Sequence, residues 1–139
     1  MPRRLRMLTA PPFLALAALA LAGCGLGGPA HEAPSPEAAA TVDMGFSSFT
    51  PETVTIRVGQ SVEWRNTSVI THSVTDDPRL AKTAGDASVP PGATTFNSSD
   101  IPAGHVFLYK FTQLGTYRYF CTHHEGDNMV GKVVVTPAS

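Results

Sequence analysis

Residues 119–132 read YFCTHHEGDNMVGK, and this stretch decides which fold and which chemistry the chain can have. A cysteine, a histidine three residues later and a methionine five residues after that put a thiol, an imidazole and a thioether on one short loop: Cys121, His124 and Met129. Soft metal ions prefer such ligands. The runs on either side of the loop have the pattern of β-strands. The stretch therefore predicts a metal site on a loop between two strands.

A second histidine upstream completes this ligand set. His72 lies in residues 69–75, where alternation predicts a strand with the histidine facing the core. Two imidazoles, a thiolate and a distant axial thioether form the ligand set of electron-transfer copper sites. Taken alone, His72 would be interpreted as a hydrogen-bonded core histidine, and the downstream loop favours a ligand. His123 competes with His124 as the second imidazole, and spacing alone separates them.

Other metals fit this set less well. Zinc prefers further cysteine or histidine ligands to a thioether, and a zinc site with one cysteine usually recruits a carboxylate or water. Glu125 and Asp127 are the carboxylates at hand, so zinc stays open as a minor alternative. The sulfur ligands disfavour a hard cation.

The whole chain has 139 residues, of which 42% are hydrophobic and 15% charged, enough for one domain with a real core. Twelve glycines and twelve prolines between short alternating runs favour an all-β domain. We predict a Greek-key β-sandwich of about seven or eight short strands over residues 41–139. The expected strands are 41–46, 53–58, 61–66, 69–75, 94–96, 106–111, 116–120 and 132–136.

The N-terminus has the layout of a secretory signal. Three arginines precede an apolar run of leucine and alanine, and the sequence Leu-Ala-Gly before Cys24 resembles the bacterial lipobox. We predict a lipoprotein signal peptide over residues 1–23, a membrane anchor through lipid on Cys24, and a flexible linker over residues 24–40. The protein would then be exported to the periplasm or the cell surface. An ordinary signal peptide that ends near a cysteine is the alternative.

Cysteine count and charge narrow the interpretation further. Cys24 and Cys121 are the only cysteines, so a disulfide between them is the simplest expectation for an exported protein. Lipidation of Cys24 would leave Cys121 unpaired, and metal ligation gives an unpaired thiol a purpose. Removal of the three signal arginines leaves seven basic against eleven acidic residues, so the chain is not basic enough to indicate nucleic-acid binding.

Residues 76–95 form a long stretch without strand periodicity, which contains several prolines and glycines. The pattern predicts a surface excursion with one helical turn around Arg79 to Ala84. Loops of this length are often functional, and a partner surface is one option.

Residues 117–135 resemble the C-terminal signature of plastocyanin-like blue copper proteins of the cupredoxin family. That signature has Cys, two residues, His, four residues, Met, then a Val/Gly pair and a final strand. Residues 62–66 and 72–75 are similar to the family's first-histidine region, and the resemblance covers about residue 41 to the end. Ser73 departs from the pattern, because plant plastocyanins have there an asparagine that ties the two ligand loops together. The excursion over residues 76–95 is an insertion relative to compact members, so the family's partner docking does not carry over.

The resemblance implies a cupredoxin sandwich that binds one copper ion through His72, Cys121, His124 and Met129. It implies Cu(I)/Cu(II) cycling and single-electron transfer between redox-partner proteins, through the exposed edge of His124 and the apolar surface around it. We expect the backbone N–H of Ser73 to donate to the cysteine sulfur. We expect a monomer that is not an enzyme and has no small-molecule substrate. A periplasmic copper carrier or storage module is the alternative, and it would need an open, exchangeable site.

Overall fold

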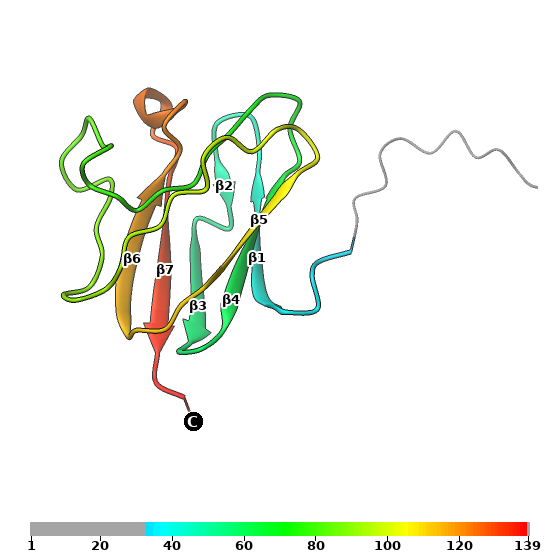
Figure 1. The fold of residues 1–139 in the computed structure, drawn as a ribbon. Coiled ribbons are helices and arrows are strands. Elements are labelled where there is room, and N and C mark those ends of the chain that lie inside the picture. Colours follow the sequence, from blue (N-terminus) through cyan, green and yellow to red (C-terminus); the bar gives the residue numbers. More distant parts are fainter. Residues whose placement is uncertain (1–32, 139) are drawn as a thin grey trace, which may run out of the picture.

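The computed structural model describes residues 33–138, and within this range the chain forms seven strands and one short 3₁₀ helix (Figure 1). The elements are β1 (Ala38–Met44), β2 (Phe49–Thr50), β3 (Thr53–Arg57), β4 (Ser61–Asn66), β5 (Val106–Lys110), β6 (Gly115–Phe120), η1 (Glu125–Asp127) and β7 (Val130–Thr136). The predicted all-β class and strand number are confirmed.

The strands form two sheets, of order β2-β1-β4-β5 and β3-β7-β6. β1 pairs in parallel with β4, and β3 in parallel with β7, while the other pairs are antiparallel. A parallel pair cannot be joined by a tight hairpin, so the chain crosses from one sheet to the other between these strands. This topology is the predicted sandwich with Greek-key connections.

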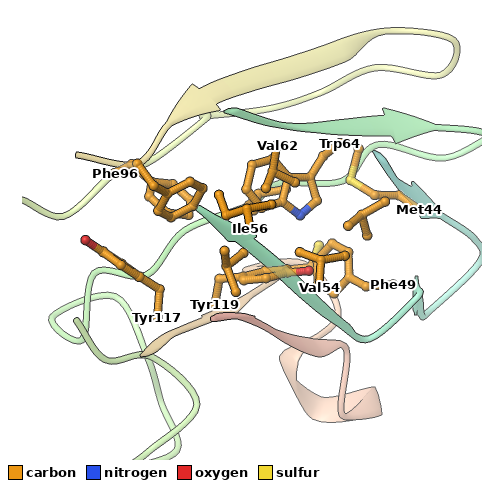
Figure 2. Packing of buried hydrophobic residues seen from close by; sticks show 14 of the residues in the cluster. Met44, Phe49, Val54, Ile56, Val62, Trp64, Phe96, Tyr117 and Tyr119 are labelled. Carbon is orange, nitrogen blue, oxygen red and sulfur yellow. The ribbon is translucent and has the colours of Figure 1, made fainter. Parts of the chain in front are cut away.

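Aromatic and β-branched side chains fill the space between the sheets (Figure 2). Val62 and Trp64 of β4 are fully buried, and the Trp64 ring meets the ring of Tyr119 edge-on, with centroids 5.2 Å apart. On β3, Val54 and Ile56 are buried between exposed neighbours. The inward faces predicted for these two strands are confirmed. The core holds the ends of β4 and β6, from which the loops with the predicted metal ligands extend.

The fold begins earlier than the sequence indicates. β1 starts at Ala38, three residues before the predicted domain start at Thr41, because Ala38 pairs with Ser61 at the beginning of β4. Just before it, the backbone N–H of Ser35 donates to Glu63 Oε2 over 3.0 Å. Alanines carry little strand preference of their own, so only this pairing reveals the strand.

Two predicted strands, over 69–75 and 94–96, are not formed. Isolated bridges replace the first, pairing His72 with Ile101 and Thr75 with Phe120. Every residue from 72 to 77 is buried, so the segment has no exposed face and the predicted alternation is wrong. It is enclosed because residues 96–101 pair with it on one side and Phe120 at the end of β6 pairs with it on the other.

The excursion over residues 76–95 forms turns and bends, and the helical turn predicted around Arg79 to Ala84 is absent from it. Farther along, Ser88 exchanges two backbone hydrogen bonds with Arg118 of β6, of 3.1 and 2.9 Å. These bonds lie on the edge of β6 that β7 leaves free. The excursion therefore covers an exposed sheet edge, which would otherwise invite pairing with another chain.

Several predictions lie outside the described residues. These are the signal peptide over 1–23, the lipid anchor at Cys24, and the linker up to residue 32. In the range from 33 to 138, no helix combines the length and apolar character needed to cross a membrane.

Candidate metal centre

Three of the four predicted ligands come together at one end of the sandwich. His72 follows β4, and Cys121 and His124 lie in the loop that joins β6 to β7, which contains the short helix η1, the orange coil in Figure 1. One candidate ligand atom from each of these three side chains lies within 4.8 Å of the others. Across the described part of the chain, this is the one such group of histidine, cysteine or acidic side chains.

Both imidazoles turn the same nitrogen toward the sulfur. His124 Nδ1 is 3.4 Å and His72 Nδ1 3.7 Å from Cys121 Sγ. Cys121 and His72 are fully buried, and His124 is half-buried. The group thus has a closed interior side and one imidazole that reaches the surface.

Short backbone hydrogen bonds close the loop between the two strands. The N–H of Cys121 donates to the carbonyl of Met129 over 3.1 Å. The N–H of Met129 donates to the carbonyl of His124 over 3.2 Å. Asn128 takes the left-handed conformation, with φ of 58°, which asparagine tolerates better than most residues. Met129 itself is fully buried. The backbone thus holds Cys121, His124 and Met129 in one compact unit.

His123, the rival of His124, is engaged elsewhere. Its Nε2 lies 2.8 Å from Asp100 Oδ1, and its side chain is exposed. It is absent from the group of converging ligand atoms. The geometry therefore favours His124 over His123, in agreement with the spacing.

Glu125, one of the carboxylates that zinc would have needed, is also engaged elsewhere. It is buried, and its Oε1 accepts hydrogen bonds from the backbone N–H groups of Lys82 and Thr83, over 2.7 and 2.8 Å. This carboxylate fastens the excursion to the loop over residues 121–129, the metal loop. The sequence did not reveal that role, because the partners lie more than forty residues away.

Ser73 ties the two ligand segments together. Its backbone N–H donates to Cys121 Sγ over 3.3 Å, which confirms the expected donor to the sulfur. Its hydroxyl oxygen accepts the backbone N–H of Thr122 over 2.9 Å and lies 2.8 Å from the Thr122 hydroxyl. A serine in place of the plastocyanin asparagine therefore still links the segment after β4 to the metal loop.

Burial sets the protonation of His72. Loss of hydration lowers the pKa of His72, and the nearby His124 ring lowers it further. A neutral imidazole is the form that binds a metal ion. The site therefore keeps His72 ready for a metal over a wider pH range than a solvated histidine would allow.

A second buried acid lies four residues beyond His72. Asp76 is fully buried, its Oδ1 accepts the backbone N–H of Phe96 over 2.7 Å, and its Oδ2 has no hydrogen-bond partner in the described structure. Burial raises the pKa of Asp76 to about 7, against the lowering effect of the Phe96 N–H. No pattern in the sequence indicates this burial, because Asp76 stands at the start of the predicted surface excursion.

Replacing Asp76 by asparagine is expected to change how stability depends on pH. Because the folded-state pKa is raised, the folded protein holds this proton more tightly than the unfolded chain does. The stabilisation is complete below about pH 4 and is lost as the pH rises through about 7. Three pKa units correspond to at most about 4 kcal/mol. Denaturant unfolding of both proteins should show the variant gaining stability relative to wild type by several kcal/mol over this range. A difference that does not vary with pH would contradict the raised pKa.

The ligand atoms of the site indicate which kind of metal ion it suits. Two imidazole nitrogens converge on a buried sulfur, and a buried methionine belongs to the same loop. Carboxylates contribute nothing to the group in residues 33–138. Soft sulfur and imidazole donors with no hard oxygen ligand suit copper better than zinc, calcium or magnesium.

Known proteins agree with this chemistry. The family described as copper binding proteins, plastocyanin/azurin family, matches residues 36–136. The chloroplastic plastocyanin of Tetradesmus obliquus is 38% identical over 93 residues, which cover 67% of this chain and 61% of that protein. The plastocyanin of Cucumis sativus is 30% identical over 95 residues, which cover 67% of this chain and 92% of that protein.

Solved structures support the fold. Amicyanin from Paracoccus versutus superposes with a TM-score of 0.56 at 28% identity, covering 75% of this chain and 87% of that one. A purple cupredoxin from Nitrosopumilus maritimus superposes with a TM-score of 0.54 at 24% identity, covering 70% and 99% of the two chains.

Proposed function

This chain belongs to the plastocyanin/azurin family of copper-binding proteins, and we propose that it carries single electrons between redox-partner proteins. We propose His72, Cys121, His124 and Met129 as the ligands of its copper ion. The observation that carries the proposal is the convergence of two Nδ1 atoms on a buried cysteine sulfur. When bound there, copper alternates between Cu(I) and Cu(II) and so accepts and releases one electron.

The residues of the chain supply a rigid and dry site. Ser73 holds the sulfur from one side through its N–H, and its hydroxyl fixes Thr122 beside it. Cys121 and His72 have no exposed surface, so solvent does not reach this side of the site. A site that stays the same in both oxidation states needs little rearrangement when an electron arrives, which favours fast transfer.

We place the route of the electron at His124, the half-buried imidazole. Phe46 and Val69 are the most exposed large apolar side chains in the described chain, at 73% and 89%. Val69 adjoins Ser68, which contacts His72, and the Gly45 backbone before Phe46 also meets the His72 ring. The His72 ring lies 4.8 Å from the His124 ring, centroid to centroid, and an apolar surface beside this pair fits brief docking of a partner protein.

A charge on this surface is expected to slow electron transfer. In Val69→Glu, a carboxylate replaces the apolar contact, so two molecules that meet through this surface repel each other. Electron self-exchange in a mixture of Cu(I) and Cu(II) protein, measured by NMR line broadening, should fall by about tenfold. The visible absorption should not change.

Leu114→Glu is the matched control. Leu114 is 49% exposed and precedes β6, at the other end of that strand from Cys121. The self-exchange rate of the Leu114→Glu protein should stay within about twofold of the wild-type rate. Equal slowing of self-exchange in both variants, or no slowing in Val69→Glu, would contradict a docking surface near His124.

Titration with Cu(II) tests the proposed function. One equivalent should give an intense blue absorption from charge transfer between the cysteine sulfur and the metal. A colourless complex would contradict it. Rapid loss of copper to a weak chelator, without stable redox cycling, would favour the copper carrier or storage module instead.

We further propose that the protein is exported and held at a membrane through lipid on Cys24, on the strength of the lipobox-like tetrad that ends at this residue. Membrane fractionation of wild type and Cys24→Ser decides this point. Release of only the variant into the soluble fraction supports the anchor, and equal distribution of the two proteins contradicts it.

A further inference from the structure

The far edge of the His72 ring contacts a serine. Ser68 Oγ lies 2.9 Å from His72 Nε2, while Nδ1 of the same ring faces Cys121 Sγ over 3.7 Å. A neutral imidazole carries one proton on either nitrogen, and a metal binds the nitrogen without it. Which nitrogen is free therefore depends on whether Ser68 gives or receives a proton in this contact.

Asn66 determines the direction of that hydrogen bond. Its Nδ2 donates to the backbone carbonyls of Ile70 and Ile101, over 2.7 and 2.9 Å, so both amide protons are used. The amide oxygen Oδ1 must then be the atom on the other side, and there it accepts the backbone N–H of Ser68 over 3.0 Å. The orientation of the Asn66 amide is thus fixed by its own partners.

The Ser68 hydroxyl has one proton and two oxygen acceptors for it. Asn66 Oδ1 lies 2.8 Å away and the Ile70 carbonyl 3.2 Å away, and neither oxygen can donate. With its proton directed to these oxygens, Ser68 Oγ can only accept from His72. Nε2 then carries the ring proton, and the lone pair of Nδ1 points toward Cys121.

We propose that Ser68, oriented by Asn66, is a positioning residue that fixes the tautomer and the ring orientation of His72 before any metal arrives. The inference rests on the proposed function, because it takes Nδ1 of His72 as a copper ligand. The backbone of Gly45 also lies beside the His72 ring. Partners of this kind, one shell beyond the ligands, orient the ligating ring and raise its affinity for the metal.

The variants Ser68→Ala and Ser68→Thr separate this role from a general structural one. Threonine keeps the hydroxyl, and alanine removes it. The first measurement uses the metal-free protein: nitrogen-15 NMR of the His72 ring at a pH where the ring is neutral. Wild type and Ser68→Thr should show the Nε2-protonated tautomer alone, whereas Ser68→Ala should show both tautomers or a shifted ring signal. The exposed Ser48 supplies the control, since Ser48→Ala should match wild type.

The second measurement is the affinity for Cu(II), by competition with a chelator. We expect a loss of roughly 10- to 100-fold in Ser68→Ala, a recovery in Ser68→Thr, and a changed reduction potential in Ser68→Ala alone. Far-UV circular dichroism confirms that each variant is folded.

An Nδ1-protonated ring in the wild type would overturn the proposal, even if Ser68→Ala failed to fold. So would a Ser68→Ala protein with unchanged ring signals and unchanged affinity. Failure of the proposed function is a separate result, because a wild type that gives no blue complex would still report its His72 tautomer by NMR.

Discussion

Replacing Cys121 by serine is expected to abolish the intense blue absorption of the copper-loaded protein. Serine keeps the size of the side chain but supplies no thiolate, and the charge transfer that gives the colour needs sulfur bound to the metal. Two imidazoles and a distant thioether bind copper more weakly than the full set, so reversible redox cycling should be lost as well. Absorption spectroscopy and voltammetry on the Cu(II)-treated variant check both losses.

The second cysteine of the chain supplies the control. Cys24→Ser removes the other cysteine sulfur of the chain and leaves His72, Cys121, His124 and Met129 unchanged, so the absorption of this variant should equal that of wild type. Colour that survives Cys121→Ser, or colour that disappears in Cys24→Ser, would contradict the assignment of the sulfur ligand.

Replacing Gly131 by alanine is expected to destabilise the fold strongly. Gly131 on β7 pairs with Tyr119 on β6, and a Cβ built at Gly131 would overlap the Tyr119 ring. The ring cannot move aside, because it is fully buried against Trp64 and Phe49, with centroids 5.2 and 4.9 Å from its own. Overpacking of a closed core usually costs 1–3 kcal/mol, and this rigid contact should lower the free energy of unfolding by about 3 kcal/mol. Denaturant unfolding measures it.

Gly126→Ala is the matched substitution. Gly126 lies in η1, on the loop that precedes β7, and a Cβ built there meets nothing within 4 Å. The free energy of unfolding of the Gly126→Ala protein should stay within about 0.5 kcal/mol of the wild-type value. Equal stability of Gly131→Ala and Gly126→Ala would show that the Tyr119 ring has more freedom than the structure gives it.

The sequence predicts the metal loop well because its information is local. The spacing of Cys121, His124 and Met129 lies within nine consecutive residues, and a loop between two alternating strands keeps such residues together. The inward faces of β3 and β4 could be predicted for the same reason, since alternation is visible within five or six residues.

The surroundings of the loop could not be predicted because they depend on contacts between distant segments. Ser73 reaches Cys121 across 48 residues of sequence, and Glu125 reaches Lys82 across 43. The backbone N–H of Ser73 was expected, but the bond from its hydroxyl to the metal loop was not. The buried carboxylates of Glu125 and Asp76 had no pattern to mark them.

The segment around His72 shows how burial on all sides defeats a periodicity argument. Its residues looked like a strand with one inward face, but the chain between 72 and 77 is enclosed throughout and makes isolated bridges. The prediction that His72 faces inward was right, while the element that carries it was wrong. Likewise, nothing in the sequence around Ser68 indicates that its hydroxyl contacts the His72 ring.

Redox titration of the copper-loaded wild type, followed by its visible absorption, tests the central claim most directly. An electron carrier built on these four residues should lose its blue colour with one electron per copper and recover it fully on reoxidation, with the metal retained throughout. Copper that leaves the protein on reduction, or colour that does not follow a reversible one-electron step, would contradict the claim.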